Sequence, residues 1–452
     1  MGRNRYLAAG MLAITLATPA ASGIAADDPA GYMAPATAMS KAVTLGTALA
    51  DLLRRHPQIE AARSGVEAAE HARGAAWAGY LPALSVSGDS GYERVSSPQT
   101  RLQAGGPDAV RRNSATARVS QPLFDGFRAG ATLEQARTAV DLARAGGDTT
   151  VQTVLLEGAT VFNEVLRQAR LVQLAVENEQ RIQQQLNLED ERVQRGSGIA
   201  VDVLQAKARL QIARERRTAF EGALREAVVR YRQVFDVSPD IGVMIDPQLP
   251  PDLIPAELDR AKRAAEAGNP VLETAARQVD LAEARKRAVA ASYYPKLDLV
   301  AEARWEDDVD GVEGIRRDRS ILLVATWELT DGLFAVARTA QASAELAATR
   351  SNRVHVSRKV QEETEMAWQA LETARKRQSL LANAVGIAGE VLDARRTLRD
   401  AGKETALNVL DAESELYAAR ISEVSAAFDA KLAELRLLAV MGELERLARA
   451  AP

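Results

Sequence analysis

Two proline-free stretches of about 70 residues each constrain the fold of this 452-residue chain more than any other feature. One runs from Gly126 to Gly196 and the other from Gly332 to Gly402. A helix over such a span would be roughly 105 Å long, whereas an ordinary globular helix has about 11 to 12 residues. A helix of this length cannot bury its apolar side chains against itself. We therefore expect it to lie against other helices of similar length, so that the chain builds a rod or a tube.

The two stretches belong to an internal duplication. Pro57 recurs 213 positions later as Pro270, in each case at a predicted helix break. The terminal glycine Gly196 recurs 206 positions later as Gly402. The difference of seven positions falls in the predicted strand hairpins, where insertions are tolerated. The chain is therefore expected to contain one structural unit twice.

The expected boundaries follow from these repeats. The first repeat covers 44–237, the second covers 257–447, and a proline-rich linker at 238–256 lies between them. Each repeat is predicted to contain a strand hairpin (84–123 and 297–329), a long helix (126–196 and 332–402) and a return helix (199–237 and 404–447).

The N-terminus has the pattern of an export signal. Arg3 and Arg5 precede an apolar run at 7–17, and small residues follow as far as Ala26. We expect a signal peptide at 1–26 and a flexible segment at 27–43. The alternative is an uncleaved anchor, but the run is shorter than the roughly 20 residues of a transmembrane helix.

The predicted strands alternate between apolar and polar residues. From Leu297 to Trp305 the odd positions are apolar, and the same holds from Ile321 to Trp327. Strands of about ten residues with this alternation cross an outer membrane, with the apolar side toward lipid. Trp305 and Trp327 are the candidate aromatic girdle. The alternative is a soluble sheet covered by helices, for which few helices remain.

Four strands per chain cannot close a barrel, because the smallest outer-membrane barrels have eight. Open sheet edges facing lipid are not viable. The sequence therefore predicts that several copies share one barrel, with the long helices continuing beneath it as a cylinder.

Composition excludes several function classes. The 57 basic and 61 acidic residues nearly balance, which argues against a nucleic-acid partner. No cysteine is present, so thiolate metal sites and a cysteine nucleophile are excluded. The three histidines have no metal-ligand spacing, and no nucleophile elbow or phosphate loop occurs. We expect no enzyme activity, catalytic residue, cofactor or metal.

Four motifs recur at the helix starts and tips: Phe124-Asp125-Gly126, Thr330-Asp331-Gly332, Asp202-Val203-Leu204 after Gly196, and Asn408 to Ala412 after Gly402. With these motifs the sequence resembles the TolC-like outer-membrane channel proteins of Gram-negative export systems. The resemblance implies a mainly α-helical homotrimer with a periplasmic tunnel and a twelve-strand barrel in the outer membrane. It also implies docking to a periplasmic membrane-fusion adaptor and to an inner-membrane ABC or proton-driven transporter.

The resemblance also implies a gate at the periplasmic end, with altered residues. Asp202 and Asp411 fall at gate carboxylates of the family, but Asn408 replaces a second acidic ring. Glu404 replaces a gate-linking arginine, and Arg399 replaces a gate tyrosine. Three copies of Asp411 around a narrow axis would favour cations. The alternative is that Asp411 is an exposed carboxylate on a helix surface.

Candidate adaptor contacts are the tip residues Gly196, Ser197, Gly198, Gly402 and Lys403, which otherwise simply form turns between helices. The predicted function is an outer-membrane export channel of a type I secretion or efflux system. The alternative is a periplasmic coiled-coil adaptor or scaffold without a pore, which would not need two strand hairpins. The lack of a lipid-accepting cysteine mildly favours a secretion or general-purpose channel.

Overall fold

A computed structural model describes residues 42–98, 101, 109–196, 199–328 and 333–449. The predicted signal peptide, most of the predicted flexible segment, Ser197, Gly198 and residues 329–332 lie outside them. The boundary of the flexible segment at residue 43 is wrong. Val43 forms a parallel bridge with Met244, in which its N–H donates to the Val243 carbonyl and its carbonyl accepts from the Ile245 N–H, both at 2.9 Å.

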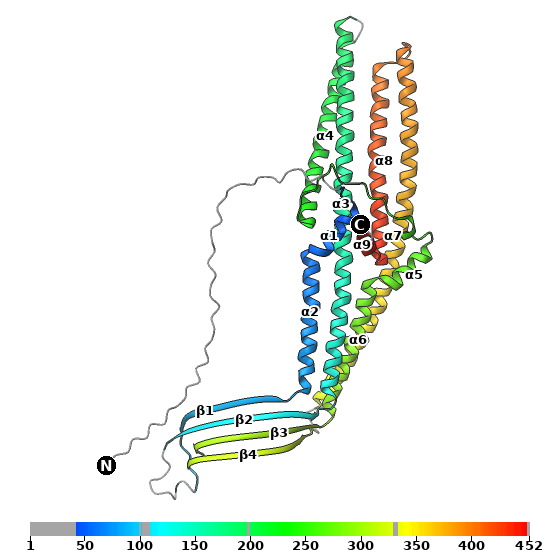
Figure 1. Cartoon of the computed structure of the whole chain (residues 1–452). Helices are drawn as coiled ribbons and strands as arrows, with labels where there is room; N and C mark the ends of the chain where they lie inside the picture. Colours follow the sequence, from blue (N-terminus) through cyan, green and yellow to red (C-terminus); the bar gives the residue numbers. More distant parts are fainter. Residues whose placement is uncertain (1–41, 99–100, 102–108, 197–198, 329–332, 450–452) are drawn as a thin grey trace, which may run out of the picture. The chain divides into compact units, whose positions relative to one another are not determined.

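Two very long helices dominate the fold, as predicted. They are α3 (Arg128–Gln194) and α7 (Phe334–Asp400), and each has 67 residues. Each turns back into a helix of 36 residues, α4 (Ala200–Phe235) or α8 (Ala406–Met441). Figure 1 shows the α3/α4 and α7/α8 hairpins side by side, with their tips far from the sheet.

Shorter helices repeat in the same way and confirm the internal duplication. In both repeats a helix of 11 residues precedes one of 21 residues: α1 (Leu45–Arg55) with α2 (Pro57–Trp77), and α5 (Leu258–Gly268) with α6 (Pro270–Ala290). His56 and Asn269 separate the helices, and each accepts a hydrogen bond from the backbone N–H two residues later. These N-caps, followed by proline at the first helical position, fix both breaks.

The C-terminal end of the predicted return helix 404–447 is wrong. Helix α8 ends at Met441, because Gly442 has φ +78°, and a short helix α9 (Leu444–Arg449) follows. A Cβ on Gly442 would lie 2.1 Å from the Gly268 carbonyl oxygen. Here the breaks in two helices touch backbone to backbone, which only glycine allows.

Four antiparallel strands form one sheet in the order β1-β2-β3-β4. They are β1 (Ala83–Glu93), β2 (Val110–Phe124), β3 (Lys296–Val309) and β4 (Val312–Thr326). Asp310 and Gly311, with φ +57° and +75°, connect β3 to β4, as in a two-residue hairpin of type I′. Strands β1 and β4 are the edges of the sheet, so one copy leaves a hydrogen-bonding edge open on each side.

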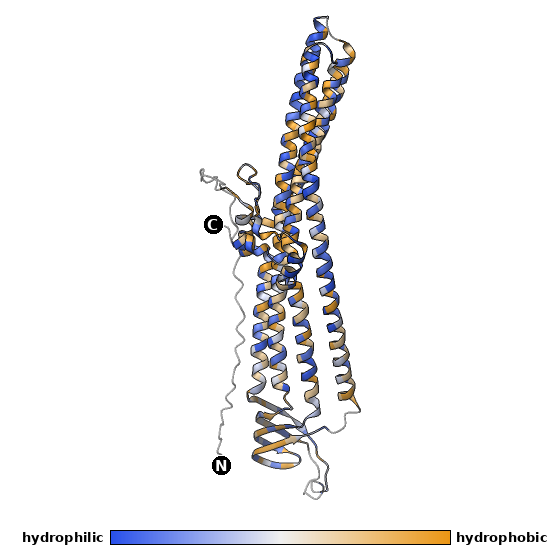
Figure 2. Cartoon of the chain, turned by 90° about the vertical axis from the view of Figure 1, so that its right-hand side faces the viewer, coloured by the Kyte–Doolittle hydropathy of each residue, from blue (hydrophilic) through white to orange (hydrophobic). Residues whose placement is uncertain are grey.

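The largest apolar core lies midway along the helices, where α1, α5 and α9 cover the two hairpins. Leu49, Leu155, Phe162 and Leu438 are fully buried there. Hydrophobic and hydrophilic residues alternate along every long helix (Figure 2), as expected for helices that each bury a stripe. Among the described residues, no helix is both long enough and apolar enough to cross a lipid bilayer.

Candidate functional site: the hairpin tips and the sheet

Near their tips the two helical hairpins have separate apolar cores. Ile182, Leu186 and Leu210 belong to a cluster within α3/α4. Leu392 and Leu416 belong to a second cluster within α7/α8. The cluster that α3 and α8 share, which includes Leu174 and Tyr417, lies closer to the middle of the helices. Beyond that cluster, polar side-chain contacts join the two hairpins in the described part of the chain.

The first polar contact is an ion pair between Glu189 of α3 and Arg399 of α7. The side chains are only 4% and 12% exposed. Glu189 also accepts from Gln185 Nε2 at 2.7 Å and lies 3.5 Å from Arg192. A carboxylate this deeply buried requires its partners, so Arg399, at the predicted tyrosine position of the gate, holds the hairpins together.

The second polar contact joins Arg209 of α4 to Asp411 of α8. Arg209 Nη2 lies 2.5 Å from Asp411 Oδ1, and Arg209 Nη1 lies 3.2 Å from Ser414 Oγ. Asp411 is half exposed, but its charge is matched by a cation on the other hairpin. We refer to Glu189–Arg399 and Arg209–Asp411 as the tip pairs.

Glu404 and Asn408 contact each other instead of the other hairpin. Asn408 Nδ2 donates to Glu404, and the Thr405 N–H donates to the same carboxylate at 3.0 Å. These hydrogen bonds, the one from Asn408 foremost, hold the pKa of Glu404 below its ordinary value. The Asn408 backbone carbonyl accepts from Arg395 at 3.3 Å. These hydrogen bonds lie at the start of α8.

The remaining predicted tip residues lie in the two turns. Gly196 and Gly402 are exposed and adopt φ +78° and +73°. The Lys403 N–H donates to the Leu398 carbonyl at 2.9 Å, which closes the end of α7. Asp202 is partly buried in the first turn of α4.

The two faces of the sheet differ in chemistry, as the alternation predicts. On the polar face, charged residues of all four strands pair with one another. Arg118 lies 2.6 Å from Glu302, and Arg112 lies 2.9 Å from Asp89. The other pairs there are Arg112–Glu93, Arg304–Glu302, Arg304–Glu306 and Arg316–Asp318.

The opposite face is mainly apolar, and we call it the apolar face. Its residues include Leu84, Val86, Val119, Leu299, Ile321 and Leu323, whose exposed fractions range from 38% to 76%. Trp305 lies on this face, opposite Arg317 of β4. Trp327 follows β4 at the helical end, 59% exposed, and its indole N–H donates to the Tyr293 carbonyl at 3.3 Å.

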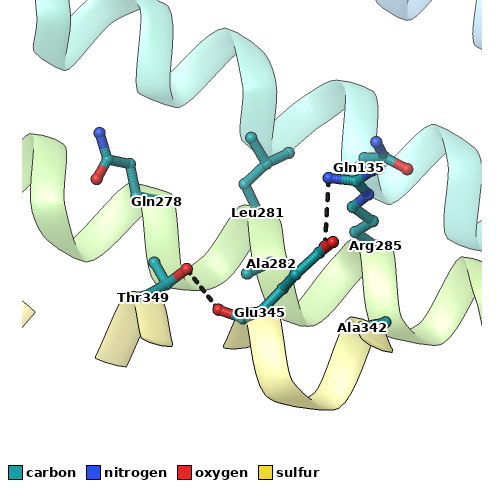
Figure 3. Close-up of a pocket in the computed structure, with 8 residues that line it drawn as sticks. All are labelled: Gln135, Gln278, Leu281, Ala282, Arg285, Ala342, Glu345 and Thr349. Atoms are coloured by element: carbon teal, nitrogen blue, oxygen red, sulfur yellow. Dashed lines mark hydrogen bonds and ion pairs between the residues drawn. The ribbon is translucent and has the colours of Figure 1, made fainter. Parts of the chain in front are cut away.

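A hollow of about 280 Å³ lies between α3, α6 and α7. Figure 3 shows that two residues of its lining pair directly, since Arg285 lies 3.5 Å from Glu345. Thr349 Oγ1 donates to the Glu345 carbonyl at 2.8 Å. The hollow arises where Ala282 and Ala342 are too small to fill the space between helices. In the described part of the chain, no group of three or more acidic or histidine side chains could hold a metal ion.

Comparison with known proteins identifies the family. The model of the outer membrane efflux protein family matches residues 48–235 and 262–443. The chain belongs to this family. It is 26% identical over 404 residues to the outer membrane efflux protein BepC of Brucella suis, which covers 89% of this chain and 86% of that protein.

Solved structures show the same fold. The CmeC outer membrane channel of Campylobacter jejuni superimposes with a TM-score of 0.75 at 12% identity, covering 88% of this chain and 85% of that one. The outer membrane protein VceC of Vibrio cholerae gives 0.74 at 16% identity, covering 88% and 96%.

The chain is thus an outer-membrane channel protein that extends into the periplasm, as predicted, and its family and structural relatives are channels and not enzymes. Membership in this family favours the predicted export channel over the alternative of a periplasmic adaptor without a pore.

Proposed function

We propose that this protein is the trimeric outer-membrane conduit of a tripartite efflux or type I secretion system, gated at its hairpin tips. The observation that carries the proposal is the four-stranded sheet with one polar face, one apolar face and two open edges. Three copies would pair each β4 edge with the β1 edge of the next copy. Twelve strands then leave no edge facing lipid, and the charged face lines a wet lumen.

The gate is the set of tip pairs. Near the tips the hairpins have separate apolar cores, so the α7/α8 hairpin can swing from α3/α4 without exposing a shared apolar core. What opposes the swing is the buried Glu189–Arg399 pair and the Arg209–Asp411 pair. A partner that binds the charged side chains of these pairs would weaken the closed state and thereby favour the open state.

The partners are a periplasmic membrane-fusion adaptor at the tips and an inner-membrane ABC or proton-driven transporter below it. The exposed turns at Gly196 and at Gly402-Lys403 are the surface available to the adaptor. Ser197 and Gly198, which follow Gly196 in the sequence, are the remaining candidate contacts. Trp305 and Trp327 mark the two borders of the membrane-embedded band, about 20 to 25 Å apart.

Planar-bilayer recording tests the proposal. Purified protein should form trimers on crosslinking and should insert as small, mostly closed pores. A variant with both tip pairs removed should conduct strongly. If the protein forms no pore even in that variant, the channel assignment is lost. Conduction by a monomer would refute the shared barrel.

A further inference from the structure

The arginines of the sheet divide into two groups according to the face on which they lie. All four on the polar face, Arg112, Arg118, Arg304 and Arg316, are in ion pairs. The register places three others on the apolar face, with Arg111 opposite Tyr92, Arg317 opposite Trp305, and Arg319 opposite Ala303. All three are exposed, and no ion pair of theirs occurs among the described residues. Cations are costly on a lipid-facing surface unless an anion meets them.

These arginines lie at the end of the sheet away from the helices. On β4 the apolar face reads Trp327, Ala325, Leu323 and Ile321 from the helical end before Arg319 and Arg317 are reached. Eight residues separate Trp327 from Arg319, which is roughly 26 Å along a strand. At a tilt of about 40° this gives roughly 20 Å across the membrane, close to the thickness of the apolar band. Arg317 and Arg319 thus lie at its outer border.

Next to Arg319 the apolar face is hollowed. Ala117, Ala301 and Ala303, from β2 and β3, form the floor of a shallow depression of about 610 Å³. Val119 and Ile321 flank Ala301, and Arg319 flanks Ala303 in the next cross-strand row toward the outer end. The lining also includes Glu302 and Ser320, which the register places on the polar face. Three small side chains in adjacent strands leave room that larger residues would fill. An apolar depression bordered by a cation is complementary to an acyl chain with an anionic head group.

We propose that this surface is a binding site for a phosphorylated lipid of the outer leaflet. Its acyl chain lies in the alanine-floored depression, and its phosphate meets the guanidinium groups of Arg319 and Arg317. Guanidinium groups match phosphate oxygens in a bidentate arrangement. Trp305, beside Arg317, packs at the level of the head group. The proposal rests on the membrane-embedded sheet of the proposed function, and it adds a specific lipid to it.

The experiment measures lipid retention by native mass spectrometry. The full trimer is placed in nanodiscs of phosphatidylethanolamine that contain bisphosphorylated lipid A as the probe. The unmodified protein should keep the probe after partial delipidation. R317Q/R319Q should weaken retention about thirtyfold, the combined effect of two interfacial arginines. R317K/R319K should restore the retention only in part, because an ammonium group keeps the charge but not the bidentate geometry of a guanidinium. Arg316→Gln is the matched control, because Arg316 lies between them in sequence, on the polar face, paired with Asp318.

Two further measurements distinguish binding through the phosphate from binding through the acyl chain. Dephosphorylated lipid A should be retained about as weakly as the probe is by R317Q/R319Q, and Ala303→Leu, which fills the depression, should weaken retention with both arginines present. Equal retention by the unmodified protein and R317Q/R319Q would overturn the proposal, and so would equal retention of both lipids. Full displacement by millimolar inorganic phosphate would show a free-phosphate site instead. Channel conductance is recorded for every variant, so loss of the pore with retained lipid would refute only the proposed function.

Discussion

Glu189 and Arg399 pair across the two helical hairpins, although 210 positions separate them in sequence. Both side chains are nearly buried, while the apolar cores on either side of them remain separate. At this level the Glu189–Arg399 ion pair joins the two hairpins, whereas shared apolar packing joins them nearer the middle of the molecule.

Removal of the Glu189 carboxylate should open the tip. Glu189→Gln leaves Arg399 buried without a counter-charge, which costs the closed arrangement about 3 to 5 kcal/mol. Single-channel recording should show longer openings. The control is Glu191→Gln, which removes an exposed intrahelical pair with Arg195 worth about 0 to 1 kcal/mol. Equal open times in both variants would contradict the gating role of Glu189.

Arg209 should set the ion selectivity that Asp411 provides. Arg209→Gln releases the Asp411 carboxylate from its partner, so preference for cations should rise. Asp411→Asn should lower it, because the acidic charge is lost. Reversal potentials in a KCl gradient measure both effects. Arg214→Gln, which removes a partner of Glu179 within the α3/α4 hairpin, should leave the reversal potential unchanged. The same reversal potential in all three variants would show that Asp411 does not line the pore.

Acidification should loosen the start of α8. The pKa of Glu404 is lowered by the Asn408 amide and the Thr405 N–H. This stabilisation is therefore present above the ordinary value near 4.5 and is lost as the pH falls through the lowered pKa. Because the chain has no cysteine, a thiol-reactive fluorophore in the Lys403→Cys variant labels this position only. Its fluorescence then follows the acid transition at the start of α8.

In Asn408→Ala the transition reported by this fluorophore should move up toward pH 4.5, since the largest cause of the shift is gone. Asn187→Ala, which removes an amide from α3, serves as the control. Identical midpoints in the Asn408 variant and the parent would show that this hydrogen bond does not govern the titration of Glu404.

Gly442 should be the least replaceable of the described glycines. Gly442→Ala forces an L-residue to φ +78° and puts its Cβ 2.1 Å from the Gly268 carbonyl oxygen, so the melting midpoint of the helices should fall. Gly386→Ala adds a Cβ in open space within α7 and should stabilise the protein by up to about 1 kcal/mol. Circular dichroism melts in detergent compare the two, and a Gly442 variant as stable as the parent would refute the close backbone contact.

Adjacent leucines of β4 test which face of the sheet meets lipid. Leu323 is on the apolar face, whereas Leu322 is on the polar face. Leu323→Arg should cost about 2 to 4 kcal/mol of folding into a bilayer, and Leu322→Arg should cost much less because it reaches the lumen. Folding into lipid vesicles, followed as heat-modifiable mobility in gels, measures the difference. A greater loss in Leu322→Arg would reverse the assignment of the faces.

Local signals made most of the fold predictable. Gly196, Gly402 and the prolines after His56 and Asn269 are residues whose backbone restrictions act within a few positions. They marked the breaks in the helices before any packing was known. The end of α8 was predicted wrongly because Gly442 stands alone within a helical pattern. Its close contact with Gly268 depends on how two distant breaks meet.

The tip could be predicted only in part. The resemblance to the channel family pointed to Arg399 and Asp411, but their partners Glu189 and Arg209 were missed. Glu189 is one of many acidic residues on α3, and its burial depends on packing against α7. The available signal was that Glu189 lies three residues after Leu186 and seven after Ile182, on the same side of the helix as these apolar residues. Pairings over about 200 positions follow from tertiary packing, which a single sequence does not reveal.

The matched lengths of the two repeats bear on how such a chain arose. Helix α3 packs between α2 and α4 of its own repeat and α6 and α8 of the other, and Asn163 donates to the Phe428 carbonyl across that boundary. A protein consisting of one repeat would leave these surfaces of α3 exposed to solvent. It would need twice as many separate chains to bury them. With both repeats in one chain, fewer subunits are needed, and the sequences of the two tips can differ from each other.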